Sequence, residues 1–251
     1  MQENLESSPP KVILVTGASS GIGQATAIAL SKIGYKCVLH GRDGVRLNET
    51  LSKCDSPEIH EILTLDLRDF NSYDVQLKNM PSLDGVVHCA GIHPKLMLLK
   101  FMKLDYLKDL QDVNVNSIIM ILSKLWRANK LKANGSIVLM SSIISQSGVM
   151  GTLAYGITKG GINSSTKILA SEFASKKIRV NSIAAGMVKT PMQESFTSAI
   201  GEDFAAKDEA RYPFGYGEAN DISSFILFLL SDQSKWLTGS VYTADGGYSI
   251  K

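Results

Sequence analysis

The chain is poor in the features that mark a disulfide scaffold, a cysteine metal site or a membrane protein. Its 251 residues include only three cysteines, Cys37, Cys54 and Cys89, and their spacing does not match a metal-ligand pattern. An odd, scattered set of thiols argues against a disulfide framework and favours a reducing compartment. We therefore predict a cytoplasmic protein whose chemistry uses no protein-bound metal.

Excess charge and long apolar runs are also missing. The formal net charge is only +2, so nothing indicates nucleic acid or an anionic membrane as a partner. The apolar stretch at residues 222–230 is too short to span a bilayer. Residues 1–10 are polar and lack the apolar core of a signal peptide, which predicts a flexible tip on a soluble protein.

What the chain does have is a regular alternation of short β-branched runs and longer helical runs. Residues 12–15 are apolar at successive positions, as in a strand covered on both faces. The pattern predicts one α/β domain over residues 11–251: a doubly wound, Rossmann-type, seven-stranded parallel sheet with helices on both faces. The predicted strands are 11–16, 35–39, 59–65, 83–88, 136–140, 178–183 and 241–243. The predicted helices are 21–33, 43–53, 71–78, 104–132, 153–175 and 219–230.

Ligands of such a sheet bind above the carboxyl ends of the strands. The stretch at residues 190–216 interrupts the alternation after the sixth strand, and it carries Met192, Phe196 and Phe204. Its length and place predict an irregular substrate lid. Its aromatic residues fit either a partly apolar substrate or the packing core of the loop itself.

A glycine-rich loop, residues 16–23, joins the first strand to the first helix with the spacing G-x-x-x-G-x-G. Gly17 permits a tight turn, Gly21 a close approach to a pyrophosphate, and Gly23 close packing of helix on strand. The free amides of the helix N-terminus suit phosphates. The alternative is a glycine-rich turn that binds nothing. Asp66, after the third strand, is either an acceptor for an adenine amino group or a capping or turn aspartate.

Tyr155 and Lys159 stand four residues apart in a predicted helix, so their side chains share one face. A phenol has a pKa of about 10, and an ammonium beside it favours the phenolate and pulls the pKa down. The pair is therefore suited to exchange a proton with a carbonyl or alcohol oxygen. The alternative for an isolated match is a solvated helix face.

Several further segments occur in the same order as in one known family. The sequence His-Cys-Ala-Gly at 88–91 is similar to the family's Asn-Asn-Ala-Gly segment, Asn114 matches its helix asparagine, and Ser142 precedes Tyr155 by thirteen residues. Residues 181–186 with Thr190-Pro191, and 236–239 with 245–247, match its later signatures. From residue 11 to 247 the chain resembles the short-chain dehydrogenase/reductase family, and within it the 3-oxoacyl-[acyl-carrier-protein] reductases.

The resemblance implies hydride transfer between a nicotinamide cofactor and a carbonyl or secondary alcohol. By resemblance Tyr155 is the acid and base, Lys159 lowers the Tyr155 pKa and binds the ribose, Ser142 bonds the substrate oxygen, and Asn114 positions a relay water. The thirteen-residue spacing selects Ser142 over Ser141, and Asn114 is alternatively a buried polar residue satisfied by backbone. The implied cofactor-binding residues are Gly17, Ser19, Ser20, Gly21, Ile22, Gly23, Arg42, Asp66, Leu67, Ala90, Gly91, Tyr155, Lys159, Gly186, Val188 and Thr190.

Two departures from the family stand in the sequence. His88 and Cys89 occupy positions where two asparagines are usual, and in relatives the first asparagine mainly ties central strands together. The substitution at residue 88 is therefore expected to affect rigidity more than chemistry. Ala185 replaces a common proline, which is expected to loosen the loop slightly.

Cofactor choice depends on the end of the second strand. An acidic residue there binds an adenosine 2′-hydroxyl, whereas a basic one binds a 2′-phosphate. Gly41 takes the acidic position and Arg42 follows, with a planar fork suited to phosphate; Asp43 is expected to N-cap the next helix. The sequence favours NADP(H) over NAD(H), although Ser20 replaces a second basic residue found in many NADP-dependent relatives.

Other functions and partners stay open. A non-catalytic dinucleotide sensor usually lacks the tyrosine or the lysine, and an extended-branch epimerase needs a larger C-terminal region than follows Ile183. The resemblance implies a homotetramer or homodimer and a small-molecule substrate, either free or bound to a carrier protein. The basic residues considered for carrier docking, or simply for ending helices, are Arg127, Lys130, Lys132, Lys176 and Lys177.

Overall fold

The computed structural model describes residues 9–92 and 95–250, so most of the predicted N-terminal tip lies outside the described residues. Seven parallel strands form one sheet in the order β3-β2-β1-β4-β5-β6-β9, which confirms the predicted architecture. The strands are β1 (Val12–Thr16), β2 (Lys36–Gly41), β3 (Glu61–Thr64), β4 (Leu83–His88), β5 (Leu131–Ser142), β6 (Arg179–Ala185) and β9 (Val241–Ala244). The order reverses between β1 and β4, where doubly wound sheets bind their ligands.

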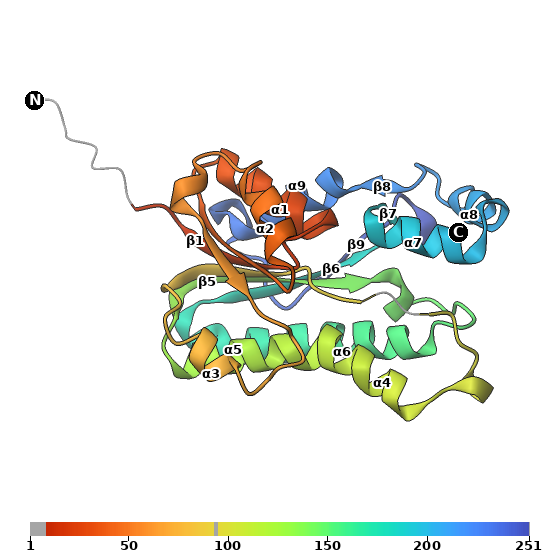
Figure 1. Cartoon of the computed structure of the whole chain (residues 1–251), viewed down its shortest axis with the longest axis horizontal. Coiled ribbons are helices and arrows are strands. Elements are labelled where there is room, and N and C mark those ends of the chain that lie inside the picture. Colours follow the sequence, from red (N-terminus) through yellow and green to blue (C-terminus); the bar gives the residue numbers. More distant parts are fainter. Residues whose placement is uncertain (1–8, 93–94, 251) are drawn as a thin grey trace, which may run out of the picture.

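Helices cover both faces of the sheet (Figure 1). One layer holds α1 (Gly21–Lys32), α2 (Gly44–Leu51) and α9 (Ala219–Leu230). The other holds α3 (Tyr73–Gln76), α4 (Leu104–Gln111), α5 (Ser117–Arg127) and α6 (Leu153–Glu172). Short 3-10 turns are η1 (Pro57–Ile59), η2 (Leu99–Phe101), η4 (Ile143–Ser145), η5 (Phe173–Lys176), η6 (Asp232–Ser234) and η7 (Tyr248–Ile250).

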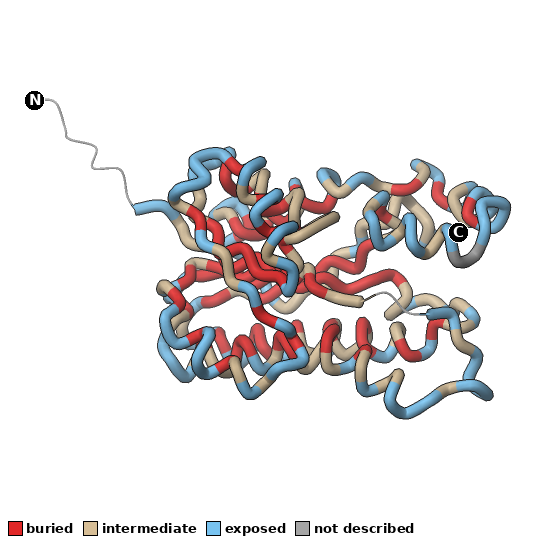
Figure 2. Tube along the Cα trace, in the orientation of Figure 1, coloured by how far each residue is buried: buried red, intermediate tan, exposed pale blue. Residues whose placement is uncertain are grey.

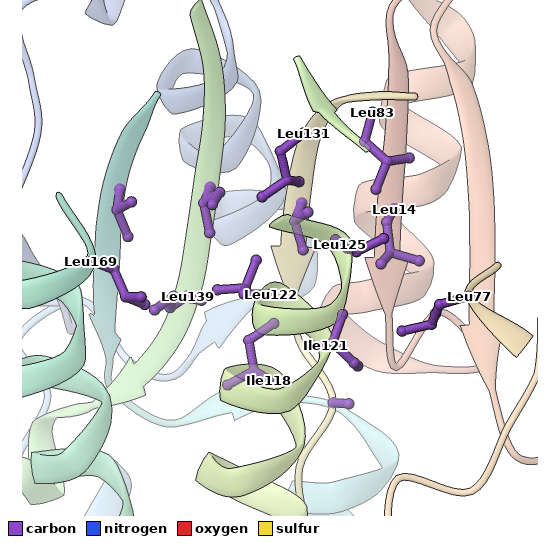
Figure 3. Packing of buried hydrophobic residues seen from close by; sticks show 14 of the residues in the cluster. Leu14, Leu77, Leu83, Ile118, Ile121, Leu122, Leu125, Leu131, Leu139 and Leu169 are labelled. Atoms are coloured by element: carbon purple, nitrogen blue, oxygen red, sulfur yellow. The ribbon is translucent and has the colours of Figure 1, made fainter. Parts of the chain in front are cut away.

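Each face of the sheet has its own apolar core. Leu14 on β1 joins the cluster under α5 and α6, whereas its neighbours Ile13 and Val15 join the cluster under α1 and α9. Figure 3 shows the side chains of Ile118 and Leu122 on α5 directed toward the strands. Figure 2 shows the buried residues concentrated in the sheet and on the inner faces of the helices. Burial on both faces explains the unbroken apolar runs of the sequence.

The structure differs in two respects from the single helix predicted for residues 104–132. A π-helical turn, η3 (Asp112–Asn116), separates α4 from α5, and α5 ends at Arg127. Asn129 then takes a left-handed conformation with φ of 52°, and Leu131 begins β5. The helical periodicity was extended too far because Leu131 is apolar and continues the pattern, although it belongs to the strand.

The stretch predicted to be an irregular lid is mostly helical. It contains α7 (Pro191–Ile200) and α8 (Glu202–Glu209), flanked by the paired short strands β7 (Val188–Lys189) and β8 (Gly217–Glu218). Thr190 N-caps α7 by accepting from the Gln193 amide, and Pro191 starts the helix. In Figure 1 both helices lie at the end of the molecule where the chain's C-terminus is marked. Among the described residues, no helix is long and apolar enough to cross a bilayer.

Candidate active site

The glycine loop packs tightly against the end of β4. Gly17 has φ of +70°, and a Cβ there would lie 2.7 Å from the Ala90 amide nitrogen. A Cβ on Gly23 would overlap the Gly17 carbonyl oxygen. Both positions therefore require glycine, one for its backbone conformation and one for close packing of α1 on the loop.

The N-terminus of α1 is available to an anion. Its N-cap Ser20 makes no side-chain capping bond, and the first turn of α1 carries no acidic residue. Residues 19–22 are only half-buried, so the loop is accessible. Uncapped amides and an uncompensated helix dipole fit the phosphates of a dinucleotide.

The segment after β6 reaches the same loop. The Thr190 methyl carbon lies 3.1 Å from the position of a Cβ on Gly21, so the predicted residues of these two segments meet. Val188 is buried beside them. Gly186 is needed for another reason, because a Cβ there would lie 2.9 Å from the Asp245 Cα of the C-terminal segment.

The end of β2 carries an exposed cation. Arg42 is exposed, and Asp43 accepts from the amides of Val45 and Arg46 at 3.0 and 3.2 Å, which confirms its predicted capping role. A Cβ on Gly41 would lie 3.2 Å from the Leu47 side chain and 3.5 Å from the Ser19 hydroxyl. This corner of the site therefore offers a guanidinium and little room for an acidic side chain.

Asp66 stabilises a turn, which is one of the two roles that the sequence allowed for it, the other being adenine binding. Its Oδ1 accepts from the Arg68 amide at 2.9 Å and lies 3.6 Å from the Arg68 guanidinium. The carboxylate is nevertheless exposed, and Leu67 beside it is buried. A turn role does not occupy both oxygens, so both interpretations remain compatible with this geometry.

His88 forms a hydrogen bond between the central strands, although histidine in place of the family's asparagine was expected to weaken that connection. Its Nδ1 lies 2.8 Å from the Thr16 hydroxyl oxygen, which also accepts from the Ala90 amide at 3.2 Å. The bond joins β4 to β1 directly under the glycine loop. Burial, with smaller effects of Lys159 and His40, lowers the pKa of His88 to about 3, so the ring is neutral at physiological pH. Sequence reasoning missed this bond because Thr16 and His88 are 72 residues apart.

The Asn114 side chain is satisfied by backbone, as the alternative interpretation predicted. Its Oδ1 accepts from the Ile92 amide at 2.8 Å, and its Nδ2 donates to the Ile92 carbonyl at 3.3 Å. These bonds hold the loop after Ala90 against the π-helical turn η3, and Nδ2 also donates to the Thr158 hydroxyl of α6 at 3.4 Å. A Cβ on Gly91 would lie 3.2 Å from Asn114 Oδ1 and 3.9 Å from the Lys159 ammonium, so the three residues meet at one point.

Ser142, Tyr155 and Lys159 come together at the end of β5 and the start of α6. The Tyr155 and Ser142 side chains are hydrogen-bonded to each other. The Lys159 ammonium donates to the Met140 carbonyl at 2.8 Å and lies 5.5 Å from the centre of the Tyr155 ring. Ser141, the rejected neighbour of Ser142, donates instead to the Lys159 carbonyl at 3.2 Å.

The electrostatics of this group differ from the sequence prediction. Burial raises the pKa of Tyr155 to about 12, and the hydrogen bond from Ser142 opposes this increase. Burial lowers the pKa of Lys159 to about 8. The net shift of the Tyr155 pKa is therefore upward, because burial has the largest effect, and the sequence did not reveal how deeply both groups are desolvated.

The basic residues considered for carrier docking lie far from these groups within one chain. Lys176 lies in η5, beyond the C-terminal end of α6, and the part of α6 that follows Tyr155 is about 25 Å long. Lys132 belongs to β5 rather than to a helix, and its ammonium pairs with Asp84 at 2.8 Å. Lys176 donates to the Asn129 side chain at 2.6 Å. Within one chain, Lys132 and Lys176 therefore do not lie at the mouth of the site. Among the described residues, no cluster of acidic, histidine or cysteine side chains could hold a metal.

Comparison with known proteins agrees with this arrangement. The family profile described as Enoyl-(Acyl carrier protein) reductase matches residues 17–249. Short-chain dehydrogenase/reductase aba4 of Botryotinia fuckeliana is 32% identical over 249 residues, covering 95% of this chain and 96% of that protein. The 3-oxoacyl-[acyl-carrier-protein] reductase FabG of Salmonella typhimurium is 33% identical over 245 residues, covering 94% and 96%.

Solved structures show the same similarity along nearly the whole chain. Levodione reductase superposes with a TM-score of 0.88 at 25% identity, covering 96% of this chain and 98% of that one. ElxO with NADP bound superposes with a TM-score of 0.84 at 27% identity, covering 96% and 100%. With the glycine loop, the switch point and the Ser142–Tyr155–Lys159 group in place, the chain belongs to the short-chain dehydrogenase/reductase family of NAD(P)-dependent oxidoreductases.

Proposed function

We propose that this protein transfers a hydride between NADP(H) and a carbonyl or secondary alcohol, with Tyr155 as the general acid and base. The observation that carries the proposal is the hydrogen bond between Tyr155 and Ser142, with the Lys159 ammonium 5.5 Å from the same ring. The bound cofactor supplies the hydride. The residues of this chain supply the proton and hold the oxygen that receives it.

In the reducing direction Tyr155 acts as the acid. A pKa raised to about 12 keeps the phenol protonated at neutral pH, which is the state that can donate. Ser142 donates a hydrogen bond to the same substrate oxygen, where negative charge develops. Lys159, whose pKa is lowered to about 8, can return a proton toward the phenolate near neutral pH. In the oxidising direction the proton moves from the alcohol to the phenolate.

Asn114 and the glycine loop hold the site together in this proposal. Asn114 fixes the Ile92 backbone beside Lys159. The π-helical turn that carries Asn114 is a feature that often occurs at functional sites, and a relay water beside Lys159 remains part of the proposal. The amides of Ser20 to Gly23 bind the pyrophosphate, and Thr190 with Val188 contacts the nicotinamide end.

NADP(H) is proposed over NAD(H) because the end of β2 offers a guanidinium and no carboxylate. Arg42 is exposed, and Asp43 is engaged in capping α2. A free fork of this kind can bind a 2′-phosphate. The similarity to ElxO, solved with NADP bound, supports the same choice.

The substrate is proposed at the level of class. The similarity to 3-oxoacyl-[acyl-carrier-protein] reductases makes a 3-oxoacyl thioester one candidate. Helices α7 and α8 are the proposed lid over the substrate, because they follow the segment that meets the glycine loop at Thr190. A homotetramer or homodimer in the cytoplasm remains the expectation from the family resemblance.

The test is Tyr155→Phe, assayed by nicotinamide absorbance with 3-oxoacyl thioesters, simple ketones and 2-enoyl thioesters. We expect the variant to bind NADPH normally and to lose at least about 100-fold in kcat, in line with the usual contribution of a general acid. Tyr35→Phe, at the amino end of β2 and so at the other end of the parallel strands, is the matched control. Turnover retained by Tyr155→Phe rejects the proposed acid. A wild-type protein that binds NADPH but reduces no carbonyl supports the sensor alternative.

A further inference from the structure

A third residue of α6 shares the face of the proposed catalytic pair. Tyr155, Lys159 and Asn163 follow one another at intervals of four, so their side chains lie along one side of the helix. The Asn163 Nδ2 donates to the Ser145 hydroxyl oxygen at 2.8 Å. Ser145 ends the 3-10 turn η4, which begins directly after Ser142. A contact therefore links the helix of Tyr155 to the turn of Ser142, away from the reacting groups themselves.

The direction of this contact is fixed by chemistry. An amide nitrogen of asparagine can only donate, so the Ser145 oxygen accepts from it. The Ser145 proton is then free to be donated, and the hydroxyl lies 2.5 Å from the Ser142 carbonyl oxygen. The result is a directed series from Asn163 through Ser145 to the backbone of Ser142. A parallel tie runs from the Ser141 hydroxyl to the Lys159 carbonyl at 3.2 Å.

The backbone held in this way determines where the Ser142 hydroxyl points. Its Oγ accepts from the Ile144 amide at 3.2 Å inside the same turn. The same hydroxyl is hydrogen-bonded to the Tyr155 side chain, so the turn that holds Ser142 also sets its distance from Tyr155. A shift of η4 relative to α6 would break this alignment without removing either reacting group.

We propose that Asn163 and Ser145 are positioning residues, which hold the Ser142 hydroxyl against Tyr155 by locking the turn after β5 to helix α6. The inference rests on the proposed function, since it assigns to these residues the alignment of its acid. Asn163 keeps its Oδ1 buried without a partner among the described residues. A buried acceptor without a partner costs free energy, so the favourable part of the Asn163 interaction is the bond that its N–H group donates to Ser145.

Matched variants separate positioning from general stability. Ser145→Ala and Asn163→Leu remove the series, whereas Ser145→Thr keeps the hydroxyl. Thr166→Val is the control, because Thr166 is buried on the same helix and bonds only the Ile162 carbonyl. For each variant we would measure kcat, cofactor dissociation constant, melting temperature and the pH dependence of kcat.

We expect Ser145→Ala and Asn163→Leu to lose about 10-fold in kcat, with the cofactor dissociation constant within about 2-fold of wild type. The basic limb of the pH–rate profile should move to higher pH, because the bond from Ser142 that favours phenolate is weakened. Ser145→Thr should restore both, and Thr166→Val should change melting temperature alone. The proposal is overturned if Ser145→Ala and Asn163→Leu both keep the wild-type kcat and the wild-type basic limb of the pH–rate profile. It is also overturned if the loss of kcat only follows the loss of melting temperature.

If the wild-type protein shows no turnover, the proposed function is rejected, but the positioning role of Asn163 and Ser145 can still be tested. In that case the phenolate titration of Tyr155 is followed by ultraviolet difference spectroscopy, with the Tyr155→Phe signal subtracted. A titration that moves upward in Ser145→Ala and not in Thr166→Val supports the positioning role. Identical titrations in the two variants reject it.

Discussion

The Lys159 ammonium lies 5.5 Å from the centre of the Tyr155 ring and donates to the Met140 carbonyl at 2.8 Å. The lysine is 5% exposed, and its burial lowers its pKa to about 8 from an ordinary value of 10.5. A buried ammonium held by one carbonyl is destabilising to the fold, so its presence is best understood through the function of the site.

Lys159→Met should make the fold more stable near neutral pH while abolishing most turnover. Between pH 8 and 10.5 the unfolded lysine holds a proton that the folded one has released, so wild-type stability should rise with pH across that window. The variant should lose this rise. Urea denaturation at several pH values measures it, and parallel curves for the two proteins would contradict the assigned pKa direction.

Arg42→Ala should weaken NADPH binding by about 10-fold and leave NADH binding unchanged, since an exposed charge-assisted phosphate contact is lost. Arg46→Ala removes a second exposed arginine one helical turn further on and should change neither affinity. Fluorescence titration with both cofactors makes the comparison. An unchanged preference for NADPH in Arg42→Ala would defeat the assignment.

Gly17→Ala should damage both stability and cofactor binding. Its φ of +70° strains any side chain, by about 1–2 kcal/mol, and the new Cβ would lie 2.7 Å from the Ala90 amide. Gly34→Ala is a matched control, because Gly34 has φ of +78° and a Cβ there meets nothing within 4 Å. Thermal melts should show a larger loss of stability in Gly17→Ala than in Gly34→Ala. NADPH titrations should show a loss of affinity in Gly17→Ala alone. Equal effects would mean that the packing against β4 is unimportant.

His88→Asn should reduce the acid sensitivity of the fold. Burial lowers the pKa of His88 to about 3 from 6.5, so the unfolded chain binds more protons between these values and stability is lost as pH falls through that window. Without the imidazole, the free energy of unfolding should change less steeply with pH between pH 6.5 and 4. The difference in slope should correspond to the uptake of up to one proton on unfolding. Denaturation at pH 7 and pH 5 tests this, with Thr166→Val as a variant of altered stability and unaltered slope. A slope equal to wild type would show that His88 is protonated in the fold.

The sequence by itself determined the architecture and the identity of the candidate groups. Unbroken apolar runs such as residues 12–15 predicted strands buried on both faces, and the structure has all seven in parallel. The family's thirteen-residue spacing, applied to this sequence, selected Ser142 over Ser141, and the structure places Ser142 against Tyr155 and Ser141 against the backbone of Lys159. Period and spacing are local properties of the chain, which is why they can be read without a fold.

The tertiary structure alone decided the environment of those groups. Desolvation of Tyr155 and Lys159 depends on every element packed around them, so the sign of the Tyr155 pKa shift could not be read from a four-residue spacing. The bonds from Thr16 to His88 and from Asn163 to Ser145 likewise join residues that only the fold brings within hydrogen-bonding distance. Burial and long-range contact are properties of the packed chain, and in this protein they set the protonation states that the chemistry requires.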